Sequence, residues 1–145
     1  MRRTVLAISA AALAVAGQLM AGGFWLQAGN PEASAEARAM HAVVTLKAAG
    51  CHDPAQAKVT AVAVGVVNGE RRTIPLEVKK LSVPGMFAIA QQWPKDGKWV
   101  IRLEGRSDEA VTSTLLAAGP EGVDRTHARS EMRVFAENEV DAMLR

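Results

Sequence analysis

The first part of the chain is apolar, and residues 4–31 contain no Asp, Glu, Lys or Arg. Two arginines, Arg2 and Arg3, stand in front of a run of apolar and small residues at 5–17. A short basic start followed by such a run is typical of a secretory signal peptide. We therefore predict that residues 1–35 form a signal peptide or an N-terminal anchor helix, and that the rest of the chain is exported.

Cleavage and anchoring are both open for this segment. The small residues Ala33 and Ala35 favour a signal peptidase cut before Glu36, and residues 14–16 fit the same rule. Alternatively, a helix over residues 5–26 would be about 33 Å long, which is enough to cross the apolar core of a bilayer. In both cases the basic start stays in the cytoplasm, so we expect the body to be periplasmic or secreted, with possible anchoring to the inner membrane.

From His41 onward the pattern changes to short apolar runs separated by turn residues, which is typical of an all-β domain. Residues 58–67 are apolar at nearly every position, so they predict a central strand with both faces covered. Asn68 and Gly69 follow at once and predict a tight type I′ hairpin, because both tolerate positive φ. We assign residues 41–118 to an antiparallel β-sandwich.

The remaining strands are expected at regular spacing. Residues 71–80 alternate apolar and polar side chains, and Pro75 places this strand at an edge or at a bulge, since proline has no N–H for the ladder. Further strands are expected at residues 86–93, 98–104 and 110–118. The tight turn between the first two predicts that they form a hairpin.

Two polar stretches flank the predicted sandwich, at residues 36–40 and 119–129, and we interpret both as linkers. In residues 130–145 apolar side chains recur at helical spacing, and Ser130 is the expected N-cap. The pattern predicts a C-terminal amphipathic helix. Such a helix either packs on its own domain or docks on a partner.

Residues 85–104, GMFAIAQQWPKDGKWVIRLE, place Gly, an apolar strand, Pro, Gly and then Trp in a fixed order. This order resembles the YtkA-like and FixH-like exported domains of bacterial envelopes. The resemblance implies an immunoglobulin-like β-sandwich with Trp99 in its core. It also implies an association with metal handling, chiefly of copper, or with the assembly of membrane oxidases.

The charge of the chain is close to balanced, with 17 Lys and Arg against 15 Asp and Glu. Without residues 1–35 these counts become 15 and 14, because Arg2, Arg3 and Glu32 are lost. A nearly neutral body gives no electrostatic reason to expect nucleic acid or an anionic membrane as a partner. We expect another envelope protein instead, and membrane contact only through an uncleaved N-terminal segment.

A small set of residues could bind a soft metal. Cys51 is the only cysteine, so it cannot form a disulfide within the chain, and His52 follows it directly. Together with His41 they offer the thiolate and imidazole groups that suit Cu(I), and Met40 and Met86 could add thioethers. The competing interpretation is structural, because cysteine is often buried and methionine often fills gaps in a core.

Sequence motifs of catalysis are missing from the chain: GxSxG, HExxH, GxGxxG and P-loop strings do not occur. Cys51 and His52 are adjacent, and neighbours on an extended segment point to opposite faces, so they do not make a catalytic dyad. We predict a non-catalytic binding or interaction module without a cofactor. The alternative is a copper-binding accessory protein that uses Cys51 and His52, with His41 as a third candidate ligand.

Overall fold

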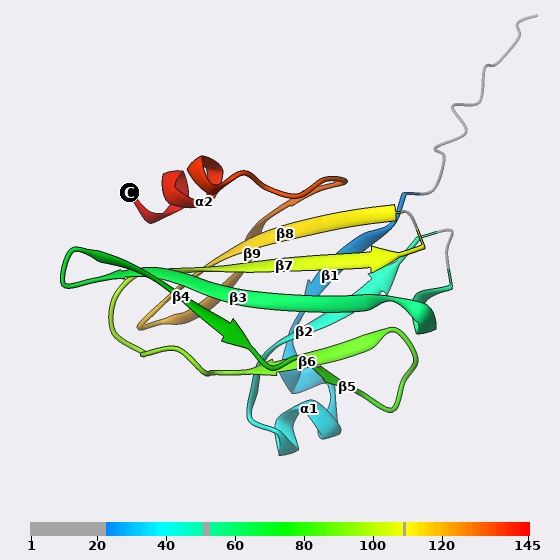
Figure 1. The fold of residues 1–145 in the computed structure, drawn as a ribbon. Helices are drawn as coiled ribbons and strands as arrows, with labels where there is room; N and C mark the ends of the chain where they lie inside the picture. Colours follow the sequence, from blue (N-terminus) through cyan, green and yellow to red (C-terminus); the bar gives the residue numbers. More distant parts are fainter. Residues whose placement is uncertain (1–22, 51–52, 109) are drawn as a thin grey trace, which may run out of the picture.

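The computed structural model describes residues 23–50, 53–108 and 110–145, and these fold into two antiparallel β-sheets packed face to face (Figure 1). The four-stranded sheet has the order β1 (Trp25–Gly29), β2 (Ala42–Ala49), β6 (Met86–Ala90), β5 (Lys79–Lys80). The five-stranded sheet has the order β4 (Glu70–Leu76), β3 (Lys58–Val67), β7 (Trp99–Ser107), β8 (Ala110–Gly119), β9 (Gly122–Glu131). The predicted all-β sandwich is therefore confirmed. In the part of the chain that is described, no helix is long and apolar enough to cross a membrane.

The core lies between the two sheets because apolar residues alternate along the strands. Leu46 of β2 and Ile89 of β6 point inward from one sheet, and Ile101 and Leu103 of β7 point inward from the other. All four are fully buried. Because successive side chains of a strand point to opposite faces of the sheet, the other residues of these strands point to the outer faces. Each sheet therefore has a second surface that can be covered.

Two turn and edge predictions are confirmed. Asn68 and Gly69 join β3 to β4 with φ of 52° and 79°, as a type I′ hairpin requires. β4 lies at the edge of its sheet, and Pro75 therefore costs no central hydrogen bond. The single strand expected at residues 71–80 is wrong: β4 ends at Leu76, and β5 follows in the other sheet.

The predicted hairpin within residues 85–104 is wrong. β6 pairs with β2 and β5, whereas β7 pairs with β3 and β8, so the intervening segment crosses from one sheet to the other. Each strand has one strongly apolar face, and crossing lets both faces meet in the core. Trp93 in the crossing segment and Trp99 at the start of β7 are both buried there.

The N-terminal boundary also differs from the prediction. Residues 1–22 of the expected leader lie outside the described residues, but Phe24 and Leu26 belong to the buried core, and β1 pairs with β2. The expected linker at 36–40 is largely helical, because α1 spans Ala35–Ala39 and is capped by Ser34, which accepts the Ala37 N–H at 3.2 Å. A cut before Glu36 would therefore remove a strand.

The C-terminal boundaries are corrected as well. The expected linker at 119–129 is mostly β9, and Ser130 lies in that strand instead of capping a helix. Its hydroxyl is 2.9 Å from that of Thr114 on β8. The helix, α2, is shorter than expected and spans Glu137–Leu144. The polar composition of residues 119–129 favours a linker over a strand. An edge strand with one solvent-exposed face, however, needs few apolar side chains.

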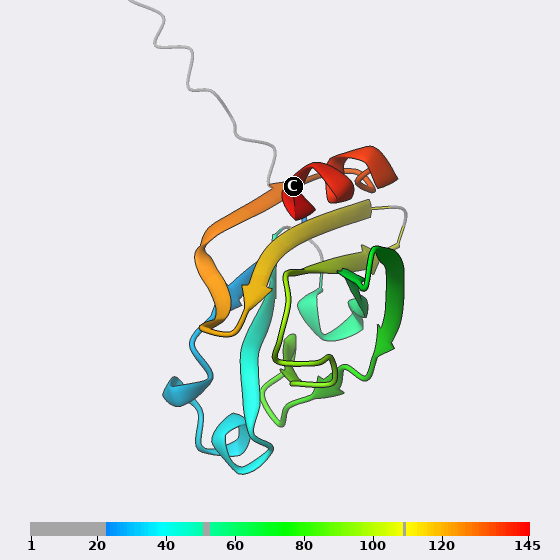
Figure 2. The same ribbon diagram turned by 90° about the vertical axis from the view of Figure 1, so that its left-hand side faces the viewer.

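α2 packs on its own domain, across the outer face of the five-stranded sheet (Figure 2). Val140 is fully buried against Val64, Val100 and Leu115, and Phe135 completes the cluster. This contact uses the second apolar face of β3, which the sequence predicted to be covered. α1 lies on the opposite side of the molecule, on the four-stranded sheet.

Candidate functional site

Of the three residues predicted to bind copper, the structure describes only His41. Cys51 and His52 lie outside the described residues, so the copper prediction stays a prediction for them. His41 is exposed and precedes β2, whereas Gly50, next to Cys51, follows the same strand. An eight-residue strand is about 26 Å long, so His41 and Gly50 lie at opposite ends of β2.

The two candidate thioethers have structural surroundings. Met40 and Met86 both pack on an apolar cluster between α1 and the outer face of the four-stranded sheet, formed by Ala37, Leu81 and Ala88. Within residues 23–50, 53–108 and 110–145, no group of three His, Cys, Asp or Glu side chains is placed to hold a metal ion. The methionines thus match the gap-filling interpretation.

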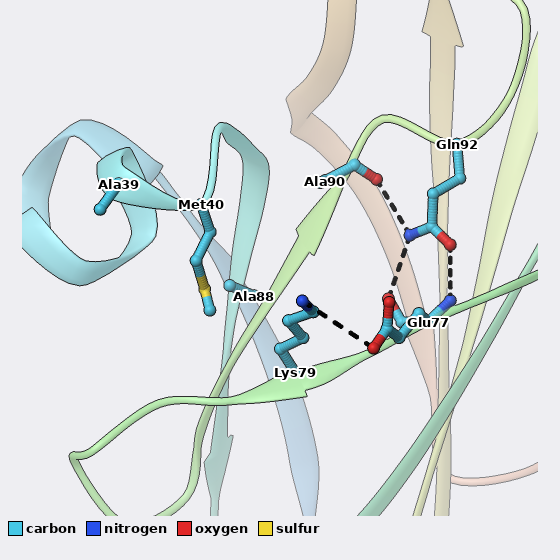
Figure 3. A pocket seen from close by; sticks show the side chains of 7 residues that line it. All are labelled: Ala39, Met40, Glu77, Lys79, Ala88, Ala90 and Gln92. Atoms are coloured by element: carbon cyan, nitrogen blue, oxygen red, sulfur yellow. Dashed lines mark hydrogen bonds and ion pairs between the residues drawn. The ribbon is translucent and has the colours of Figure 1, made fainter.

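A hollow of about 390 Å³ lies beside this apolar cluster, and we call it the α1–β6 hollow (Figure 3). Its floor is made by Ala88 and Ala90, which point away from the core because Ile89 between them points into it. Met40, at the end of α1, forms one wall and points toward Ala88. The residues that line it are Ala39, Met40, Glu77, Lys79, Ala88, Ala90 and Gln92.

The wall of the hollow opposite α1 is built by Gln92. β5 pairs with β6 over two residues only, so the ladder stops before Ala90. The Gln92 side chain takes over there: its amide nitrogen donates to the carbonyls of Glu77 (3.1 Å) and Ala90 (3.2 Å), and its oxygen accepts the Glu77 N–H at 2.7 Å. The Gln92 amide thus makes the hydrogen bonds that a neighbouring strand would make, and it holds the Glu77 segment beside β6.

α1 is held in place by a carboxylate. Glu36 accepts the N–H of Ser82 at 3.0 Å and its hydroxyl at 2.8 Å, which ties the helix to the loop between β5 and β6. These hydrogen bonds, first the one from the backbone and then the one from the hydroxyl, lower the pKa of Glu36. Both walls of the hollow are therefore fixed by hydrogen bonds to backbone groups.

The rim of the hollow carries one ion pair, between Lys79 Nζ and Glu77 Oε1 at 3.9 Å. Both side chains are more than half exposed, so water screens the attraction and the pair contributes little to stability. The hollow thus combines an apolar floor, an adaptable thioether and two loosely held charges of opposite sign. This composition suits contact with a mixed apolar and polar group.

A second hollow, of about 460 Å³, lies between the edge strands β1 and β9 and is wider open than the first. Arg125 in its wall donates to the carbonyl of Val43 at 3.3 Å. That carbonyl is available because the pairing of β2 with β6 shifts register between Ala42 and Val44. The arginine thus satisfies a backbone group at a bulge, which is a structural role.

His127, the third histidine of the chain, lies on β9 and lines neither hollow, although its neighbour Ala128 lines the second one. Its Nδ1 is 2.8 Å from Asp124 Oδ2, and Asp124 also accepts the backbone N–H of Thr126 and of His127. The contact with the His127 ring is the main cause of the lowered pKa of Asp124. The pair is highly exposed and holds the local turn of β9.

Sequence reasoning missed the α1–β6 hollow because its residues come from three separate segments, at 39–40, 77–79 and 88–92. The sequence predicts a linker at Met40 and an ordinary strand at Ala88 and Ala90. The one local signal is Gln92, a polar side chain at the end of an apolar strand. Its bonding partners could not be read from the sequence.

Comparisons with known proteins do not assign the chain to a family. No family model, no curated protein and no solved structure matches it.

Proposed function

We propose that this protein is an exported, non-catalytic binding module of the bacterial envelope that receives an apolar group of a partner protein in the α1–β6 hollow. The observation that carries the proposal is the hollow itself. Its volume of about 390 Å³ falls in the range of ligand pockets, and it is more enclosed than the hollow between β1 and β9. Export is supported by the basic start and apolar run at residues 1–17.

The chemistry of the lining supports binding without bond-making. Ala88 and Ala90 leave room for an incoming side chain, and Met40 can adjust its rotamers to the shape of that side chain. Lys79 and Glu77 sit at the rim, where polar contacts surround the buried anchor of a protein interface. The amide of Gln92 is already used in three hydrogen bonds.

We further infer that the sandwich is of the immunoglobulin-like type. Its support is the strand order: β1-β2-β6-β5 corresponds to the order A-B-E-D, and β4-β3-β7-β8 corresponds to C′-C-F-G. β9 is then an additional strand beyond G. This order agrees with the fold that the resemblance of residues 85–104 to YtkA-like and FixH-like domains implies.

Nuclear magnetic resonance tests the hollow with a defined probe. The ¹⁵N-labelled protein is titrated with anilinonaphthalene sulfonate, whose apolar rings suit the floor and whose sulfonate suits Lys79. We expect chemical shift changes at residues 39–40, 77–79 and 88–92. Ala90→Leu should abolish them, because three added carbon atoms fill the space above the floor.

The matched control is Ala55→Leu, which adds the same atoms to an exposed alanine of the short 3-10 turn Pro54–Gln56. This variant should titrate like the unmodified protein. Shift changes confined to other surfaces, or equal changes in Ala90→Leu and Ala55→Leu, would contradict the proposal. A partner found later by other means should lose affinity with Ala90→Leu and keep it with Ala55→Leu.

A further inference from the structure

One end of the sandwich carries two exposed apolar side chains, Trp25 and Met132, that line the same surface hollow. Trp25 is 44% exposed and Met132 is 72% exposed, although both are large and hydrophobic. They line one hollow of about 200 Å³ together with Ser130 and Glu131. Only five large hydrophobic residues are exposed in the described chain, and Val134, two residues beyond Met132, is another of them.

We call this end of the sandwich the Trp25 end. The pairing of the strands shows which strand ends lie there. Trp25 at the start of β1 is opposite Ala49 at the end of β2, and Ser107 at the end of β7 is opposite Ala110 at the start of β8. Figure 1 shows the described chain entering at this end. Exposed apolar side chains that gather at one place mark an interaction surface.

Gly23, the first described residue, lies against the side chain of Met132. A Cβ atom on Gly23 would be 2.5 Å from the Met132 sulfur, so the thioether covers this glycine. The residues that precede Gly23 are uncharged back to Thr4. Since β1 takes Trp25 and Leu26 into the sheet, residues 5–22 remain for a membrane segment, and as a helix they would be about 27 Å long, within the range of a spanning segment.

We propose that residues 5–22 hold the chain in a lipid bilayer and that the Trp25 end rests on the bilayer surface, with Trp25 and Met132 at the level of the headgroups. Tryptophan favours this level because its ring is apolar and its N–H is polar. Met132 fits the same place because its flexible thioether can pack among acyl chains. The 200 Å³ hollow between them is open to a lipid chain.

The charges at the Trp25 end favour no particular lipid headgroup. Lys58 and Arg106 are opposite each other in the register of β3 and β7, and Arg133 follows Met132; Asp53, Asp108 and Glu131 bring the opposite sign. Balanced charge gives no electrostatic attraction to anionic lipid. The contact should therefore form equally on phosphatidylcholine bilayers with and without phosphatidylglycerol.

The proposal is independent of the α1–β6 hollow. Ala90 on the floor of that hollow pairs with Ala42 at the start of β2, whereas Trp25 pairs with Ala49 at its end. The hollow thus lies at the opposite end of the strand. A chain attached through the Trp25 end would present the hollow away from the bilayer.

Fluorescence quenching tests the contact, because Trp25 is the accessible tryptophan, while Trp93 and Trp99 are 4% and 1% exposed. The full chain is reconstituted into phosphatidylcholine vesicles in which the lipids are brominated near the headgroup end of their acyl chains. We expect the bromines to remove the share of the emission that belongs to Trp25. That share is the difference between the full chain and Trp25→Phe in unbrominated vesicles.

Trp25→Phe in brominated vesicles is the control, and its emission should equal that in unbrominated vesicles. Iodide in the water should quench Trp25 less in vesicles than in detergent-free buffer after removal of residues 1–22. Emission of the full chain that bromine leaves unchanged would overturn the proposal, and so would a full chain that fails to float with the vesicles. Neither result affects the titration of the α1–β6 hollow, so failure of the two proposals can be told apart.

Discussion

Gly65 fixes the position of the largest side chain in the core. It lies opposite Trp99 in the pairing of β3 with β7, and a Cβ atom there would be 2.4 Å from the Trp99 ring. The ring cannot easily move aside, since its N–H donates to the carbonyl of Asp96 at 3.0 Å and Trp99 is only 1% exposed. The Trp99 indole therefore fits against β3 only when residue 65 has no side chain.

Replacing this glycine should be costly. We expect Gly65→Ala to lower the free energy of unfolding by about 2 kcal/mol, the cost of overpacking a close-packed core. Urea unfolding followed by tryptophan fluorescence measures it. The control is Gly119→Ala, also in a strand, where the nearest atom to a new Cβ is 3.7 Å away. A Gly65→Ala protein as stable as Gly119→Ala would contradict this account.

His41 separates the two versions of the copper hypothesis. His41 precedes the start of β2, whereas Gly50 follows the end of that strand. We expect His41→Ala to leave the Cu(I) affinity of the protein unchanged. If the double variant Cys51→Ser with His52→Ala also leaves it unchanged, the copper-binding alternative is wrong. Competition with a chromophoric Cu(I) chelator provides the measurement.

At the scale of elements, β3 and α2 show how far periodicity leads. The predicted bounds of β3, Lys58–Val67, are confirmed, because the apolar residues in its middle are covered on both faces, although Val66 near its end is 47% exposed. α2 was predicted too long, since Met132 and Phe135, near the start of the apolar pattern, belong to the segment before the helix. Helical spacing identifies a covered face but not where the backbone becomes helical.

The start of α2 depends on a carboxylate. Glu139 accepts the N–H of Ala136, the N-cap, at 2.9 Å and two N–H groups of Arg133 at 2.7 and 2.8 Å. The hydrogen bonds from Arg133, followed by the one from Ala136, lower the pKa of Glu139 to about 2. The folded state thus favours the ionised carboxylate, and Glu139 joins the helix to the segment that follows β9.

This pKa makes the stability of the protein depend on pH. The contribution of Glu139 is fully present above its unfolded pKa of 4.5 and is lost as the pH falls toward 2. We expect the free energy of unfolding to fall less between about pH 6 and about pH 3 in Glu139→Gln than in the unmodified protein. Glu121→Gln, an exposed residue in the turn between β8 and β9, should retain the full pH dependence. Urea unfolding at both pH values checks this.

At the scale of the whole molecule, β1 belongs to the fold although it lies within residues 1–35, the predicted signal peptide or anchor. Phe24 and Leu26 are 4% and 2% exposed, so a chain that begins at Glu36 loses two core side chains as well as an edge strand. Burial of two such side chains contributes about 4 kcal/mol. The predicted cut before Glu36 is thus incompatible with the sandwich described here, whereas a cut before Phe24 would preserve it.

The expected outcome can be measured in two ways. A chain that begins at Gly23 should unfold cooperatively in urea, and a chain that begins at Glu36 should be less stable by about 4 kcal/mol or fail to fold. Leu26→Ala in the longer chain is a milder variant and should cost about 3 kcal/mol. Mass spectrometry of the mature protein should find no N-terminus beyond Phe24. Equal stability of the two chains would contradict the role given to β1.

The sequence by itself determined the local structure of this protein. Strand periodicity, the Asn68–Gly69 turn and the edge position of Pro75 depend on backbone sterics and on neighbouring residues, so they could be read from the chain. Tertiary structure decided which strands pair, as for β6 and β7, because both apolar faces suited several partners. It also decided the α1–β6 hollow and the Trp25 end, since each depends on segments that meet only after the sheets have packed.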